Sequence, residues 1–205
     1  MTNSFPIGWV LRAGTADFAV GCRVLEPNVP QFGDMVKVPL TDSSAVFGLI
    51  YNVQVEDDLA VRQLILAGEL EPQIIKDQRE NRLVPIELSI LTVGHQQDRR
   101  ISHGLPPQPP LSLDKLTICS DADLRAFTRV TDYTYRFDYL RLVLNATHAP
   151  TDELLIASLN RAAQAQPPEI RRRFLLAAGR ELARLMSLDM MRLDGILQRI
   201  KPEQE

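Results

Sequence analysis

Short runs of strand-forming residues, separated by glycine, occupy the first fifty positions of the chain. Each run is long enough for one half-buried strand, and glycine tolerates the backbone dihedrals of the tight turns between strands. The runs lie at residues 7–10, 18–20, 33–38 and 46–50, and Gly14-Thr15 supplies one of the turns. Closely spaced short strands of this kind predict a small closed β-barrel.

The β-type pattern continues to about residue 118, with one helix-like run at 57–68. The segment 71–83 is polar and charged, and is interpreted as a connecting loop or a short helix. The prolines of 104–110 favour an extended surface stretch, because proline fixes φ and lacks an amide donor. We expect this stretch to form a strap across one end of the barrel. The expected strands are 7–11, 18–24, 35–38, 45–55 and 84–93.

From Ser120 onward the hydrophobic period becomes helical. Ser120 is predicted to cap a helix that begins at Asp121, and further helices are expected at 151–165, from Pro167-Pro168 onward, and at 188–200. We expect residues 201–205 to be a frayed end. The predicted fold class is therefore α+β, with an N-terminal small closed β-barrel at 1–118 and a C-terminal α-helical bundle at 119–205.

The segment 133–139 fits two different structures. Tyr133, Tyr135, Phe137 and Tyr139 alternate as in a strand, whereas Tyr135 and Tyr139 also share one helical face with residues farther on. This aromatic segment is predicted to form a contact surface between the barrel and the helices.

Residues 6–118 resemble the HAS barrel, the N-terminal β-barrel of HerA-type hexameric helicases and of the ATP synthase catalytic subunits. The matching motifs, in chain order, are Ile7-Gly8 with Val10, Gly14-Thr15, Gly33-Asp34-x-Val36-x-Val38, Phe47-Gly48-Leu49-Ile50, Ile86-Glu87-Leu88 and the proline-rich stretch from Leu105. The resemblance implies a barrel that packs side to side into rings and docks partners around a motor.

The motor itself has no counterpart in this sequence. A phosphate-binding loop needs a glycine-rich turn followed by lysine and Ser/Thr, and here no glycine precedes a lysine. Nucleophile motifs such as Gly-x-Ser-x-Gly do not occur either. The chain is therefore predicted to be no enzyme and to need no cofactor. We expect an interaction or assembly module that either binds a separately encoded HerA-type ATPase or nuclease or self-associates.

Composition adds limits on partner and compartment. Hydrophobic residues make up 45% and charged residues 24% of the 205 residues, as in an ordinary globular protein. The net charge of −3 argues against a dedicated duplex-DNA binder. Cys22 and Cys119 are predicted to be reduced thiols, and no apolar run is long enough to span a membrane. A cytoplasmic location is expected.

The three histidines do not show the spacing of a metal site. His95 and His103 are expected to be solvated loop residues, and His148 is expected at a helix end, where its charge would suit the dipole. No metal is predicted.

Two basic clusters are the candidate contact residues. Arg99 with Arg100, and Arg171 with Arg172 and Arg173, are either solvated surface residues or contacts to phosphate or to an acidic protein surface. With Tyr133 and Tyr135 they could hold a single nucleic-acid strand by stacking. Nucleic-acid binding through the barrel face and these arginines is therefore the alternative function.

Overall fold

The computed structural model describes residues 7–24, 30–40, 43–55, 59–66, 68, 84–131 and 134–200. The strands are β1 (Gly8–Ala13), β2 (Asp17–Val24), β3 (Met35–Pro39), β4 (Ala45–Val55), β5 (Val84–Gln97), β6 (Arg100–Ser102), β7 (Lys115–Ile118), β8 (Arg129–Thr131) and β9 (Thr134–Tyr135). The helices are α1 (Leu59–Leu66), α3 (Asp121–Thr128), α4 (Leu140–Leu144), α5 (Thr151–Gln164), α6 (Pro168–Leu185) and α7 (Met190–Arg199).

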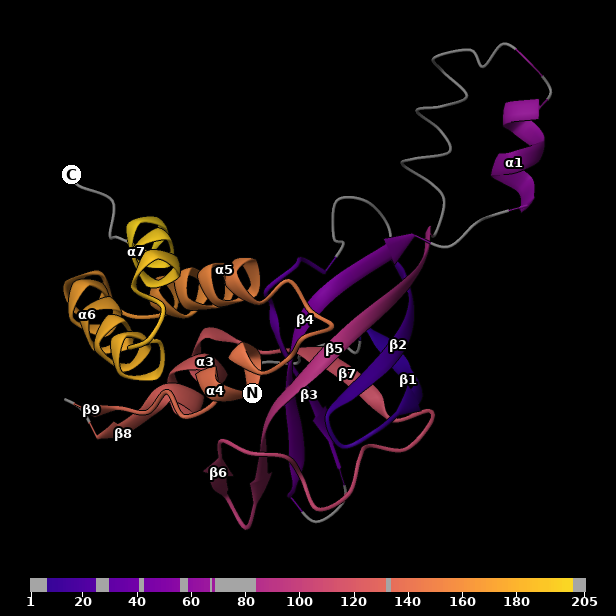
Figure 1. Cartoon of the computed structure of the whole chain (residues 1–205). Coiled ribbons are helices and arrows are strands. Elements are labelled where there is room, and N and C mark those ends of the chain that lie inside the picture. The colour runs from indigo at the N-terminus through magenta and orange to yellow at the C-terminus, as the bar shows by residue number, and fades with distance from the viewer. Residues whose placement is uncertain are drawn as a thin grey trace.

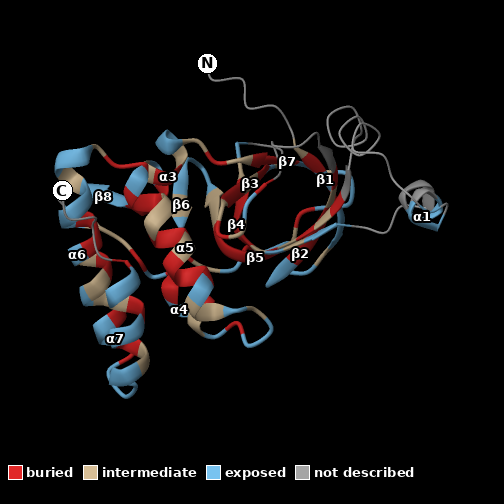
Figure 2. Ribbon diagram, turned by 90° about the horizontal axis from the view of Figure 1, so that it is seen from above, coloured by how far each residue is buried: buried red, intermediate tan, exposed pale blue. Residues whose placement is uncertain are grey.

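A closed antiparallel barrel forms the N-terminal part, as predicted. Its six strands follow one another in the order β1, β2, β5, β4, β3 and β7, and β7 pairs with β1 to complete the circle. The short strand β6 extends β5 beyond the barrel, and Figure 2 looks into the barrel, with the helices to one side. Closure pairs the strand edges that an open sheet would leave exposed.

The barrel interior is a core of its own. Alternate residues of the strands point inward, as the two-residue side-chain period of a strand requires. The fully buried members of this cluster are Val10, Val20, Val36, Val38, Val46, Ile50, Leu88, Ile90 and Leu116. All of them are valine, isoleucine or leucine, which suits strands buried inside a small barrel.

The helices pack against the outer face of β3, β4 and β5. Phe47, Leu49 and Val93 from this face belong to the same buried cluster as Leu154 and Leu159 of α5. The barrel and the helices therefore share a continuous hydrophobic core, and β1, β2 and β7 lie on the side of the barrel that the helices leave uncovered (Figures 1 and 2).

Local signals set the helix starts. Ser120 caps α3 as predicted, because its side chain accepts a hydrogen bond from the Asp123 amide while the Asp123 carboxylate accepts one from the Ser120 amide. Helix α5 begins at Thr151, and α6 begins at Pro168, where proline loses no helical hydrogen bond. Asp189 caps α7 through the Arg192 amide.

The structure also resolves the ambiguous or unrecognised segments. Residues 134–135 form β9, which pairs with β8 in a short hairpin, so no helix runs through this segment. Strand β6 was not expected from the sequence. The chain between β6 and β7 crosses the lower end of the barrel in Figure 1. The predictions for 71–83, for 201–205 and for Tyr133 lie outside the described residues.

Candidate functional site

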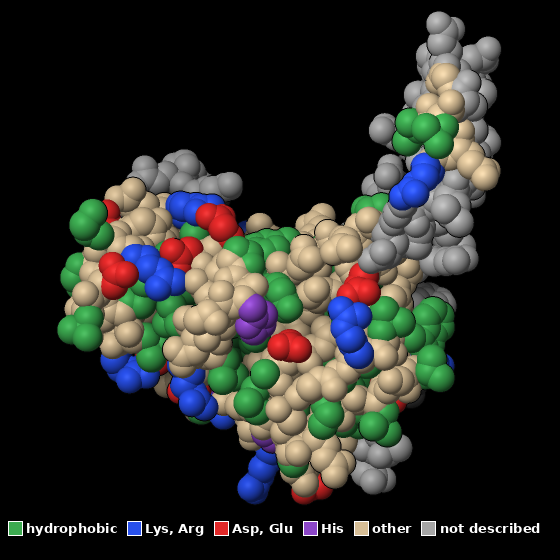
Figure 3. All heavy atoms as spheres, turned by 45° about the vertical axis from the view of Figure 1, so that its right-hand side comes forward, with side chains coloured by type: hydrophobic (Ala, Val, Ile, Leu, Met, Phe, Trp, Pro, Cys, Tyr) green, Lys and Arg blue, Asp and Glu red, His purple; other side chains and the backbone are tan. Residues whose placement is uncertain are grey.

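An apolar surface lies on β1 and on the neighbouring turn before β7, on the side of the barrel away from the helices. We call it the β1 surface and define it by four large apolar side chains that are about half to three-quarters exposed: Trp9 47%, Leu11 49%, Leu111 71% and Leu113 78%. Large exposed apolar side chains that gather in one place on a protein mark interaction sites more often than single scattered ones do. Hydrophobic side chains also gather on the right-hand part of the barrel in Figure 3.

The pairing of β1 explains why these side chains face outward. Val10 is fully buried inside the barrel, so its neighbour Trp9 points out. The register between β1 and β2 shifts between Val10 and Arg12, and this bulge leaves both Leu11 and Arg12 exposed. Trp9 pairs with Gly21 on β2, which has no side chain to cover the indole. Leu11 fills part of that space, because a Cβ on Gly21 would meet its methyl groups at 3.2 Å.

The turn before β7 adds the other two leucines. The Leu113 amide donates to the Val10 carbonyl and the Asp114 carbonyl accepts from the Val10 amide, both at 2.9 Å. These bonds hold the turn directly beside the outward residues of β1. Leu113 has φ of 73°, a conformation that costs a residue with a Cβ about 1–2 kcal/mol. The turn therefore presents an exposed leucine in a strained conformation that glycine or asparagine would adopt more easily.

Two cations border the β1 surface. Lys115 is exposed and is the direct strand partner of Trp9, so both side chains lie on the outer face of the barrel. Arg12 is bound to Glu87 at 2.5 Å, and this contact raises the pKa of the guanidinium above its ordinary value. The positive charge of Arg12 is thus already balanced by a neighbouring carboxylate.

A shallow polar groove of about 230 Å³ lies next to Arg12 on the barrel. Its polar lining comes from Arg12, Asp17, Tyr51 and Ser89. His148 lies in the loop before α5, with its Nε2 3.8 Å from an Asp17 oxygen and its ring edge against Tyr51. The groove is smaller than ordinary ligand pockets of about 300–1,000 Å³. His148 is not at the C-terminal end of a helix, because α4 ends earlier, at Leu144.

The first basic cluster lies at the tip of the β5–β6 turn. Arg99 and Arg100 are both exposed, and Arg99 has φ of 65°. The turn lies well away from α6 in Figure 1, so the structure does not bring Arg99 and Arg100 together with the second cluster.

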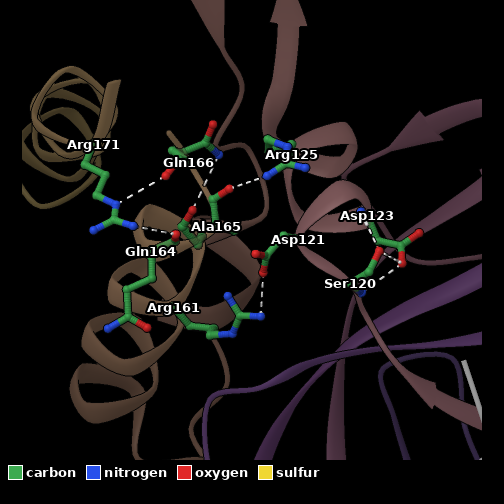
Figure 4. Close-up of polar contacts among 10 residues, drawn as sticks. Ser120, Asp121, Asp123, Arg125, Arg161, Gln164, Ala165, Gln166 and Arg171 are labelled. Atoms are coloured by element: carbon green, nitrogen blue, oxygen red, sulfur yellow. Dashed lines mark hydrogen bonds and ion pairs between the residues drawn. The ribbon is translucent and has the colours of Figure 1, made fainter. Parts of the chain in front are cut away.

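The second cluster is on α6, and its first residue, Arg171, makes hydrogen bonds within the protein. The Arg171 guanidinium donates to the carbonyls of Gln164 and Gln166, each at 3.2 Å (Figure 4). Arg125 donates to the neighbouring Ala165 carbonyl at 2.5 Å. Carbonyls at a helix C-terminus lack partners within the helix and carry partial negative charge, so these two arginines stabilise the end of α5.

The remaining predicted contact residues differ in their surroundings. Arg172 and Arg173 are exposed on the first turns of α6. Tyr135 is half-buried and lies edge-on against Phe174, with ring centroids 5.1 Å apart, which makes it part of the helical core. Tyr135 therefore packs within the helical part, against α6, and not at the contact between barrel and helices that was expected for this segment.

The expectation that His103 is solvated was wrong. Its side chain is buried, its Nε2 lies 2.9 Å from the Phe127 carbonyl oxygen, and its ring stacks on Phe127. Burial lowers the pKa of His103 to about 4, so the neutral imidazole is the stable form. No local pattern around His103 indicates this burial, because the aromatic partner is on α3, far along the chain. The expectation for His95 was also wrong, because this residue lies on β5, is partly buried and contacts the Gly104 carbonyl.

Both cysteines are free thiols, as predicted. Cys22 lies in the barrel interior, and Cys119 lies in the core shared with the helices. Burial raises the pKa of each thiol, so neither is an activated nucleophile.

The described part of the chain contains neither a metal site nor a membrane-spanning helix. Within it, no three His, Cys, Asp or Glu side chains group as a metal site requires. The helices in the same ranges are all too short or too polar to cross a membrane. No model of a known protein family matches the chain, and no curated protein matches it significantly.

The β1 surface itself was not predicted from the sequence. The signals for it were present in Trp9, in the outward phase of a strand, and in Leu111-Ser112-Leu113 directly after the proline-rich stretch. What could not be foreseen is that the turn and β1 are neighbours and that the helices cover the opposite side.

Proposed function

We propose that this protein is a non-catalytic interaction and assembly module whose barrel docks onto a partner protein. The observation that carries the proposal is the β1 surface, an exposed apolar surface on the side of the barrel that the helices leave uncovered. The helices cover the outer face of β3, β4 and β5, whereas the β1 surface is exposed and open to a partner.

The closed barrel determines how such a partner would bind. Each strand of the circle has neighbours on both sides, so a partner cannot add a strand to the barrel. Docking therefore depends on side chains that project from the outer face. Trp9 and the leucines of the β1 surface supply the buried apolar contact that such docking needs.

The partner we propose is a separately encoded HerA-type ATPase in DNA processing. The support is the resemblance of residues 6–118 to the HAS barrel, together with the closed barrel that the chain adopts. A chain with this barrel and without a phosphate-binding loop suits an accessory subunit rather than a motor.

The test is a co-purification of the tagged full chain with the HerA-type ATPase of the same source, followed by light scattering to measure the mass of the complex. We expect a stable complex with the unmodified chain and loss of it with the double variant Trp9→Ser, Leu11→Ser. The matched control is Leu188→Ser, at a fully exposed leucine on the helical part. A complex that survives the double variant would overturn the β1 surface as the docking site, and the lack of any complex would overturn the proposed partner.

Nucleic-acid binding is the rival that the same material can test. Phosphate contacts release counterions, so a protein that binds DNA through them loses affinity as the salt concentration rises. If the proposal is correct, a titration of single-stranded and double-stranded DNA across salt concentrations should show no such affinity. If the affinity for DNA falls as salt is added, and falls also in the double variant Arg99→Ala, Arg100→Ala, nucleic-acid binding is favoured.

A further inference from the structure

We infer that the β1 surface binds a short, extended partner segment in which apolar side chains stand next to carboxylates. This inference rests on the proposed function and specifies the chemistry of the partner at the docking site. It is carried by the outward apolar residues around Trp9, by the exposed Leu113 beside them and by the charge of Lys115.

The outer face around Trp9 has a leucine on one side and a cation on the other. Gly21, Trp9 and Lys115 form a row across β2, β1 and β7, because each is the direct pairing partner of the next. The Leu11 side chain lies over Gly21, because a Cβ on Gly21 would meet it at 3.2 Å, so Trp9 and Leu11 together form the apolar part of this face. A branched or aromatic side chain of a partner can therefore lie against Trp9 while a neighbouring carboxylate reaches Lys115.

The turn at Leu113 supports a binding role independently of that row. Leucine is costly at a positive φ, and here its side chain is 78% exposed, so it gains almost nothing from packing within the chain. The hydrogen bonds of the turn hold Leu113 in this conformation, and its exposure is explained if a partner buries it.

Size and charge favour a short segment over a folded face. A standard interface involves about 20–30 residues on each side, whereas the β1 surface has four apolar side chains. A second copy of this chain, docked through the same surface about a two-fold axis, would bring two Lys115 ammonium groups to one apolar contact. Arg12 is already paired with Glu87, so Lys115 is the cation that selects for acidic flanks.

The chain offers a direct probe, because Trp9 is its one tryptophan. We would titrate the full chain with a short synthetic peptide that carries a Leu-Leu pair flanked by glutamates, and follow the emission of Trp9. The comparison peptide has the same leucines flanked by lysines. We expect a saturable blue shift with the acidic peptide, and binding at least about tenfold weaker with the basic one.

Three variants make the test specific. Lys115→Glu should reverse the preference between the two peptides. Leu113→Gly should weaken binding of the acidic peptide about tenfold without lowering the midpoint of thermal unfolding. Leu188→Ala, at an exposed leucine outside the β1 surface, should bind as the unmodified chain does.

The outcomes separate this inference from the proposed function. Equal binding of the two peptides, or no blue shift with either one, overturns the inference that the β1 surface binds an acidic segment. This holds even if the ATPase still co-purifies through Trp9 and Leu11. If Lys115→Glu reverses the preference between the peptides but the chain captures no ATPase, the inference is supported and only the proposed partner is overturned. A concentration-dependent dimer that Leu113→Gly abolishes would show that a second copy is the occupant, and would overturn the inference.

Discussion

The imidazole of His103 stacks on the ring of Phe127 and also contacts the backbone of that residue. The ring centroids are 4.3 Å apart and the planes are inclined by 23°. Because Nε2 donates to the Phe127 carbonyl, Nδ1 is the bare nitrogen of the neutral ring, and it is buried without a hydrogen-bond partner in the structure. The Tyr139 ring also contacts the imidazole, with the ring centroids 5.3 Å apart and the planes nearly perpendicular. This contact joins the segment after β6 to helix α3.

His103 should make the stability of the protein depend on pH. Burial lowers the pKa of the folded-state imidazole to about 4, below the ordinary value near 6.5. The unfolded chain therefore binds more protons between these values, so this contribution is fully present above pH 6.5 and is lost as pH falls toward 4. We would measure the free energy of unfolding in urea at pH 7.5 and at pH 5. Between these pH values the unmodified chain should lose about 2 kcal/mol more than His103→Gln does. The expectation fails if both proteins lose the same free energy.

Arg171 should act on stability rather than on ligand binding. Arg171→Met removes two donors from the C-terminal carbonyls of α5, and we expect a loss of about 1 kcal/mol in the free energy of unfolding. Arg172→Met is the matched control, because the next residue on the same helix is exposed and should change stability little. If Arg171 instead served as a phosphate contact, the two variants would unfold alike and Arg171→Met would weaken DNA binding.

Gly33 should tolerate no side chain. It has φ of 85°, and a Cβ there would lie 2.5 Å from the Cβ of Ala157 on α5. Gly33→Ala should therefore push α5 away from the barrel and lower the free energy of unfolding by about 2–4 kcal/mol. The control is Gly195→Ala on α7, where a new methyl meets nothing within 4 Å and where helix propensity predicts a gain of up to about 1 kcal/mol. Equal midpoints for the two variants in thermal unfolding would contradict this close approach.

Lys37 and Asp123 connect strand β3 to the start of α3 with an ion pair of 2.6 Å. Burial opposes ionisation of Asp123, but the hydrogen bonds from Lys37 and Ser120 outweigh it and lower the pKa of the carboxyl. Stability from this group is present above the unfolded-state pKa and is lost as pH falls through the folded-state value. Lys37→Met should raise the pKa of Asp123 in an NMR titration and cost about 1 kcal/mol. An unchanged carboxyl titration would mean that Ser120 alone holds Asp123.

Much of the fold was predictable because its signals are local. Glycine-separated runs indicate the barrel strands, and Ser120 followed by Asp123 indicates the start of α3. These signals act within a few residues, through turn dihedrals, side-chain alternation and capping hydrogen bonds. Strand β8 was not expected, and the segment that contains β9 fitted both a strand and a helix, because strands this short do not show a period.

The candidate site was less predictable, because it depends on which segments become neighbours. The arginine clusters were visible in the sequence, yet Arg171 faces the end of α5, and His103 is buried by Phe127. The order of residues was sufficient for the class of fold, since propensity and periodicity are properties of adjacent positions. Tertiary packing alone decided that Trp9 and Leu113 lie together in solvent while Phe47 is covered by helices, because burial depends on contacts between segments far apart in the chain.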